Sequence, residues 1–133
     1  MGTRSLIHFK DDYTVLCTIY RQIDGYPEGR GKELADFLKG KKIVDGIPFG
    51  EPTDGLAHGP GCLAAQWIAH EKDDVGGVYM WIAGDGCELV DYVYTVTVKD
   101  FQVTLQCTDG EEVLFNGAPS EFDAFLTKLN EEA

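Results

Sequence analysis

The sequence predicts an α+β fold, a mainly antiparallel sheet of about five to six strands with three helices packed on it. Three observations favour this class. Segments with strand periodicity follow one another through tight turns, helical periodicity occurs in only three places, and strands and helices do not alternate regularly. The 133 residues suffice for one hydrophobic core, and no repeat or linker divides them, so we expect a single domain over 1–133.

The first half of the chain predicts a hairpin followed by one short helix. β-Branched and aromatic residues dominate 6–10 and 13–20, on either side of a tight turn. Apolar residues then recur at helical spacing over 34–38, and Gly40 is placed to end that helix. Prolines and glycines interrupt 43–61, which predicts a long loop.

The second half predicts a second helix, four strands and a third helix. Residues 62–72 carry a wide apolar band, and 78–83 form a short continuous apolar run that is typical of a central strand. Alternation of apolar and polar residues is clearest over 90–99 and continues over 101–107. Asp109-Gly110 favours a two-residue hairpin turn into the last strand.

The third helix is predicted from its start signal and its apolar stripe. Ser120 stands where an N-cap is expected, with Asp123 three residues later in the capping-box position. The stripe that follows consists of Phe122, Phe125, Leu126 and Leu129.

The net charge of −12 is unevenly distributed. Residues 1–50 hold eight basic and seven acidic residues, whereas 51–133 hold three basic and sixteen acidic ones. Such a surface repels nucleic acid and anionic membranes, so no direct contact with either is expected, and the partner it favours is a protein with a basic surface. Solubility alone is the alternative explanation of the acidity. No apolar segment is long enough for a membrane helix or a signal region, which predicts a cytoplasmic protein.

The segment Tyr20–Leu38, YRQIDGYPEGRGKELADFL, is the main candidate for a binding site. It resembles a P-loop, but the glycine spacing is one residue too long, and Glu33 replaces the hydroxyl residue that would bind magnesium. Its polar and aromatic side chains are expected either to surround a small anionic or planar ligand or to anchor a protein interface. The alternative is a turn whose glycines only set backbone angles. The candidate residues are Tyr20, Arg21, Gln22, Asp24, Tyr26, Arg30 and Lys32.

The four cysteines are far apart and form no C-x-x-C pair, so no metal site, redox motif or cofactor is predicted. Cys62 begins the second predicted helix, where the helix dipole favours a thiolate, and His58 is the nearest candidate base. His8 and His70 are further candidate bases. A Cys62-dependent hydrolase or transferase is therefore one hypothesis, although a buried, small hydrophobic role for Cys62 is favoured.

The segments MGTRSL, YRQIDGYPEGRGKELADFL, GCLAAQWIA and GGVYM together resemble a family of small uncharacterised proteins of phages and bacteria. The resemblance extends to about Tyr94. It implies a short cytosolic protein of a virus or mobile element and assigns no activity to any residue. With the acidity, it favours a non-enzymatic binding protein, an inhibitor of a host defence or nucleic-acid-handling protein. The alternative hypotheses are a small-molecule or nucleotide-binding module that uses the glycine-rich loop 25–32, and the Cys62-dependent enzyme.

Overall fold

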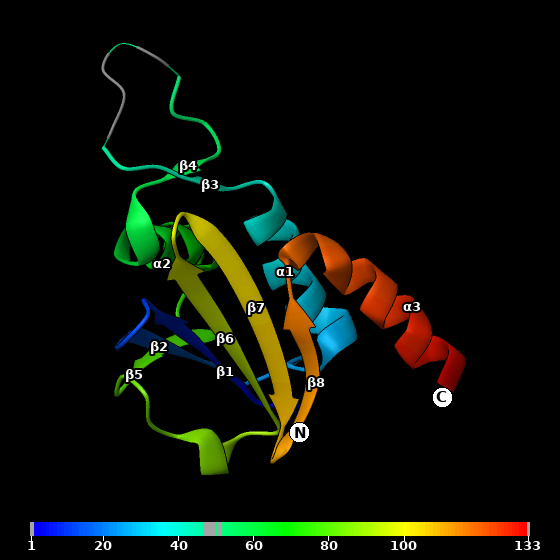
Figure 1. The fold of residues 1–133 in the computed structure, drawn as a ribbon. Coiled ribbons are helices and arrows are strands. Elements are labelled where there is room, and N and C mark those ends of the chain that lie inside the picture. The colour runs from blue at the N-terminus through cyan, green and yellow to red at the C-terminus, as the bar shows by residue number, and fades with distance from the viewer. Residues whose placement is uncertain (1, 47–49, 51, 133) are drawn as a thin grey trace.

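The computed structural model describes residues 2–46, 50 and 52–132. Six strands form one sheet in the order β5-β2-β1-β6-β7-β8, and its neighbouring strands are antiparallel except for the central pair β1 and β6 (Figure 1). The predicted α+β class with a mainly antiparallel sheet is confirmed. The strands are β1 (Ser5–Lys10), β2 (Val15–Arg21), β5 (Val78–Trp81), β6 (Tyr92–Lys99), β7 (Gln102–Asp109) and β8 (Glu112–Gly117).

Three α-helices accompany the sheet, α1 (Lys32–Lys39), α2 (Gly59–Glu71) and α3 (Phe122–Glu132). Three short helical turns precede or join these elements, η1 (Pro27–Gly31), η2 (Cys87–Leu89) and η3 (Pro119–Glu121). A separate two-stranded parallel ladder, β3 (Lys42–Ile43) with β4 (Leu56–Ala57), lies within the predicted long loop. Gly40 is the C-cap of α1, as its position in the sequence indicates.

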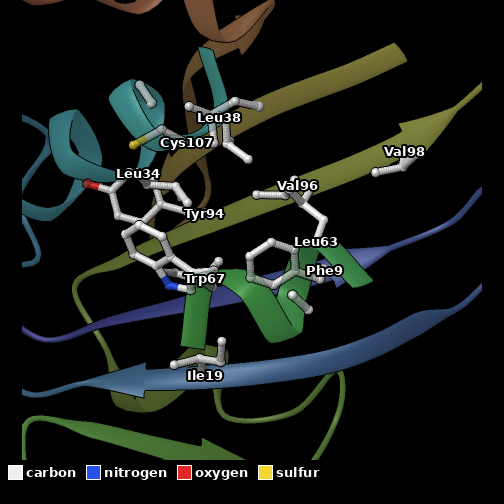
Figure 2. Packing of buried hydrophobic residues seen from close by; sticks show 14 of the residues in the cluster. Phe9, Ile19, Leu34, Leu38, Leu63, Trp67, Tyr94, Val96, Val98 and Cys107 are labelled. Atoms are coloured by element: carbon white, nitrogen blue, oxygen red, sulfur yellow. The ribbon is translucent and has the colours of Figure 1, made fainter. Parts of the chain in front are cut away.

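One hydrophobic core lies between the helices and one face of the sheet. Figure 2 shows side chains of α1 and α2 directed at side chains of β1, β2 and β6. The largest of them, Trp67 of α2, is fully buried, as are Phe9 of β1 and Tyr94 of β6. Burial of each such side chain contributes about 1.5–3 kcal/mol, so this face supplies most of the stability.

The strand at 78–81 is an edge strand, and its predicted central place is wrong. Only β2 pairs with β5 among the described residues, and only Val78 of this strand is buried. A continuous apolar run is typical of a strand covered on both faces. Here the run is apolar although both faces of the strand remain exposed beyond Val78.

Phe101 and Ser120 do not have the structural roles that the sequence predicts for them. Asp100 and Phe101 both have positive φ, at 50° and 62°, and form the turn between β6 and β7, so Phe101 lies outside the strand that the alternation over 101–107 predicts. Ser120 lies within η3 and does not cap α3. Glu121 instead closes the start of η3, where its Oε1 accepts a hydrogen bond from the N–H of Ala118 at 2.9 Å.

The second face of the sheet has a thin cover made by the connection between β5 and β6. The N–H of Gly84 donates to the hydroxyl of Thr18 at 2.8 Å, which fixes the connection on β2. Gly86, with φ of 91°, lies against the sheet, where a Cβ would come within 3.3 Å of the Leu6 side chain. As a result Leu6, His8 and Thr18 are buried although no helix covers them.

Candidate functional site

The glycine-rich segment after β2 forms one π-helical turn, η1, that continues directly into α1. Its backbone N–H groups are bonded within the protein. The N–H of Gly29 donates to the carbonyl of Tyr26 at 2.9 Å, and that of Arg30 donates to the carbonyl of Asp24 at 2.8 Å. A phosphate cradle requires such groups to point at the ligand, so these two are not available to an anion.

The glycines of this turn allow it to lie against the core. A Cβ on Gly31 would be 2.7 Å from the hydroxyl oxygen of Tyr94, and one on Gly25 would be 2.7 Å from the Cβ of Ser5. The buried Tyr94 hydroxyl in turn donates to the carbonyl of Gly25 at 2.7 Å. Close packing therefore accounts for glycine at both positions without a ligand.

Two of the predicted binding residues meet in a charged cleft of about 550 Å³ between η1, the end of α2 and the start of β5. Arg21 ends β2, and Arg30 lies in η1. The cleft brings them together with Glu33 of α1 and Glu71 of α2, two carboxylates that the sequence analysis did not assign to a site. The pairing of Arg21 with Glu71 spans 50 positions of the chain, and no local pattern indicates it.

The four charged groups form two ion pairs joined through their carboxyl groups. Arg21 Nη1 donates to Glu71 Oε1 at 2.6 Å, and both side chains are less than 8% exposed, at 6% and 7%. Arg30 Nη1 donates to both oxygens of Glu33, at 3.2 and 3.1 Å.

Burial raises the pKa of Glu33, and its hydrogen bond to Glu71 raises it further. Burial also opposes ionisation of Glu71, but hydrogen bonds from Glu33 and Arg21 outweigh it and lower the pKa of Glu71.

The other five predicted binding residues lie elsewhere. Tyr20 points to the opposite face of the sheet, because successive residues of a strand alternate between faces. Gln22 lines a separate hollow near the N-terminus, and Asp24, with φ of 60°, accepts a hydrogen bond from the Tyr26 hydroxyl at 3.4 Å. Lys32 forms ion pairs with acidic residues of α1 and α3. The segment thus distributes its polar side chains over several places.

Cys62 and His58 are both exposed, and no hydrogen bond joins them within the part of the chain that the structure describes. The favoured expectation that Cys62 is a buried hydrophobe is wrong. Leu63, Ala64 and Trp67 form the buried stripe of α2, and Cys62 lies outside that stripe at the start of the helix. Cys107, by contrast, is fully buried on the apolar side of its strand.

An apolar surface, here called the β5 surface, lies at the free edge of the sheet. Its members are the exposed Tyr79, Met80, Trp81 and Ile82, together with the half-buried Tyr20. The ring centroid of Tyr20 lies 6.0 Å from that of Tyr79 and 5.8 Å from that of Trp81. Tyr20 is therefore the one predicted binding residue that belongs to this surface.

Acidic residues lie on both sides of the β5 surface along the chain. Asp73 and Asp74 precede β5, and Asp85 and Glu88 follow it, and all four are exposed. An unpaired edge strand with large apolar side chains tends to pair with other chains, and flanking charge restricts which chains can approach.

Tyr20 and Thr18 lie on the face of the sheet that the helices do not cover. On this face His8 lies between Thr18 and Cys87, a residue from a distant part of the sequence. His8 Nδ1 lies 2.7 Å from Thr18 Oγ1, and His8 Nε2 lies 3.7 Å from Cys87 Sγ. His8 was a candidate base only for Cys62, and the 79 positions between His8 and Cys87 hide their contact from sequence analysis.

No cluster of three or more potential metal ligands occurs among residues 2–46, 50 and 52–132. None of the helices in these ranges is long and apolar enough to cross a membrane. Comparison with protein-family models, curated proteins and solved structures found no match to this chain. The resemblance to small phage and bacterial proteins therefore stays a prediction.

Proposed function

We propose that this chain is a non-enzymatic binding protein that docks on a basic protein partner through the β5 surface. The observation that carries the proposal is the run of four large apolar residues, 79–82, exposed at a free sheet edge. The partner adds a strand to β5 through main-chain hydrogen bonds, and its side chains contact the aromatic rings.

The charge of the chain determines which partner is favoured. The acidic residues on either side of β5 attract a basic surface and speed its approach. The same net charge of −12 opposes pairing of two copies of this chain edge to edge. A nucleic-acid-handling protein presents a basic surface of this kind, and occupation of that surface by this chain would inhibit it. The proposed role as an inhibitor rests on this charge complementarity.

The test is affinity capture from a bacterial lysate over a series of salt concentrations, followed by mass spectrometry. Wild-type protein should retain basic proteins at low salt and release them as salt rises or when heparin competes as a polyanion. The variant Met80→Ser with Ile82→Ser should lose these proteins. The matched control is Val113→Ser, because Val113 is similarly exposed, at 52%, on the opposite edge strand.

Two results would exclude the β5 surface as the docking site. One is equal retention of the same proteins by the wild type and by the Met80→Ser, Ile82→Ser variant. The other is retention that neither salt nor heparin reduces, because such binding would not depend on the acidic residues. A wild type that sediments as a dimer, with the double variant as a monomer, would assign the surface to self-association instead.

A second candidate function, binding of a small anion, is favoured by the charged cleft. Two guanidinium groups, those of Arg21 and Arg30, line the cleft, and the side chain of Arg30 is 20% exposed. A carboxylate or phosphate group of a ligand can accept hydrogen bonds from such a guanidinium. A thermal-shift titration with nucleotides and with inorganic phosphate tests it, and Arg30→Gln should abolish any stabilisation that wild type shows. No shift with any of these anions would exclude this function for them.

A further inference from the structure

Cys87 is the only cysteine among the described residues whose sulfur lies within hydrogen-bond distance of a histidine. It is the first residue of η2, in the connection that covers the second face of the sheet, and its side chain is exposed. The 3.7 Å between Cys87 Sγ and His8 Nε2 is a long hydrogen-bond distance for sulfur, which a small movement of the exposed side chain would shorten.

His8 is held in place on the side away from the sulfur. Its ring is 6% exposed, and its Nδ1 lies 2.7 Å from the hydroxyl of Thr18, which is fully buried. The N–H of Gly84 donates to the same hydroxyl at 2.8 Å, which fixes the oxygen. In the tautomer with its proton on Nδ1, His8 donates to Thr18 and the lone pair of Nε2 faces Cys87. Only in this tautomer are nucleophile, base and orienting group in contact in that order.

The environment of His8 keeps its ring neutral. Burial lowers the pKa of His8, and the nearby positive charge of Lys10 lowers it further. The imidazolium is therefore disfavoured, and His8 can hold the proton of a thiol only transiently, as the sulfur attacks.

We propose that Cys87 is a nucleophilic thiol, with His8 as its base and Thr18 as a positioning residue, and that it reacts with low-molecular-weight disulfides. The proton of the thiol passes to His8 Nε2 as the sulfur attacks one sulfur of the disulfide. A new S–S bond to Cys87 forms while the bond within the small disulfide breaks. The departing thiolate takes the proton back from His8. Cys87 is oxidised to a mixed disulfide, one equivalent of small thiol is released, and His8 is neutral again.

The surroundings of Cys87 favour a disulfide over an ester or amide as the substrate. Acyl transfer develops a negative oxygen that needs hydrogen-bond donors. The charged neighbours of Cys87 in the chain are the carboxylates Asp85 and Glu88, which would repel that oxygen. Disulfide exchange creates no oxyanion, but the same carboxylates oppose a free thiolate at Cys87, so removal of the thiol proton during the attack depends on His8.

The mixed disulfide should persist because no second thiol is placed to displace it. Cys17 packs against the core on the helix-covered face, and Cys107 is buried there. Cys62 lies in the first turn of α2, a helix that packs on that same side of the sheet. The small thiol would therefore stay attached until an external reductant removes it.

The other cysteines supply internal controls in one experiment. Cys62 is exposed like Cys87 but has no histidine hydrogen bond in the described structure. Burial raises the pKa of Cys17, and it raises the pKa of Cys107 to about 12. Cys62 thus reports the rate of an exposed thiol that has no histidine partner among the described residues, and reaction at Cys107 reports unfolding.

The experiment measures the rate at which each thiol of the full chain reacts with cystamine at pH 7, by acid quenching and peptide mapping in a mass spectrometer. Wild-type Cys87 should react about tenfold faster than Cys62, because an ordinary thiol is mostly protonated at this pH. His8→Gln and Thr18→Val should reduce the Cys87 rate to that of Cys62, whereas Thr18→Ser, which keeps the hydroxyl, should retain it. Oxidised glutathione, an anion, should react more slowly than the cationic cystamine because of Asp85 and Glu88.

Equal rates at Cys87 and Cys62 in the wild type would overturn the proposal. So would a fast Cys87 in both His8→Gln and Thr18→Val. If a variant also exposes Cys107 to reaction, its fold is lost, and the wild-type ratio of the two exposed thiols then decides the question alone.

Discussion

On the helix-covered face of the sheet, the fully buried side chains are large and apolar, as with Phe9 and Trp67, whereas the opposite face buries the polar His8 and Thr18 beneath one connecting segment. Over most of its area the thick apolar layer provides stability and, in the described part of the chain, exposes no polar group, and the charged cleft of Arg21 and Glu71 lies only at its end. The second face instead has a thin cover over hydrogen-bonded polar groups. The helix-covered face therefore maintains the fold, while the second face and the free edge carry the β5 surface and the contact of His8 with Cys87.

The largest expected effect is on the free energy of unfolding, and a pair of tryptophan substitutions, one on each side of this comparison, measures it. Trp67→Ala removes a fully buried ring from the helix-covered face and should lower the free energy of unfolding by about 3–5 kcal/mol. Trp81→Ala removes a ring that is 40% exposed on β5 and should lower it by less than about 1 kcal/mol. Urea denaturation measures both. Similar losses for the two variants would contradict the division between the faces.

A slightly smaller effect is expected where charge is buried at the end of the helix-covered face. Arg21→Met leaves Glu71 buried without its guanidinium partner and should lower the free energy of unfolding by about 3 kcal/mol. Replacement of both residues by Met removes the unpaired charge and should be less harmful than the single change. A double variant that loses the sum of the two single losses would show that the pair does not act as a unit.

On the second face of the sheet, the buried His8 should make the stability of the fold depend on pH. Because the pKa of His8 is lower in the folded chain than its ordinary value of 6.5, the unfolded chain binds the proton more readily. The contribution of neutral His8 to stability is therefore fully present above pH 6.5 and decreases as the pH falls below it. Denaturation of wild type and His8→Gln at pH 8 and pH 5 measures this. The variant should lose less stability than the wild type between these two pH values, and an identical pH response of the two proteins would contradict the burial of a neutral His8.

The smallest expected effect is at the exposed rim of the helices, where Asp123 of α3 lies 3.0 Å from both Lys32 and Lys39 of α1. Hydrogen bonds from Lys39 and then Lys32 lower the pKa of Asp123. Its side chain is 54% exposed, so water and salt screen these ion pairs. Asp123→Asn should lower the melting temperature slightly at low salt and leave it unchanged at 1 M salt. A decrease in melting temperature that persists at 1 M salt would indicate that Asp123 stabilises the fold through packing and not through its charge.

Much of the fold is predictable because local periodicity reflects burial. In β6, the alternation of Tyr94, Val96 and Val98 with polar neighbours indicates the buried face, and all three are buried. In β5 the same reasoning fails. The apolar residues there follow no requirement of the core, since Met80 and Ile82 remain exposed, and a binding surface produces the same pattern as a central strand.

The candidate sites are less predictable because they depend on contacts between distant residues. Arg21 and Glu71 are 50 positions apart, and His8 and Cys87 are 79 positions apart. Both contacts depend on the pairing of β1 with β2 and with β6, which local sequence patterns do not specify. Each of these residues alone has an ordinary explanation in the sequence. The glycine-rich turn instead predicts a ligand site that its glycines do not require. Gly31 is explained by the nearby Tyr94 hydroxyl, which leaves no room for a Cβ.

Hydrogen exchange of the chain, alone and bound to a captured basic partner, tests the central claim most directly. Binding through the β5 surface should slow exchange of the amides of 78–82 and leave the opposite edge strand, β8, unchanged. Protection confined to β8 or to α3, with β5 amides exchanging as fast as in the free chain, would contradict the claim.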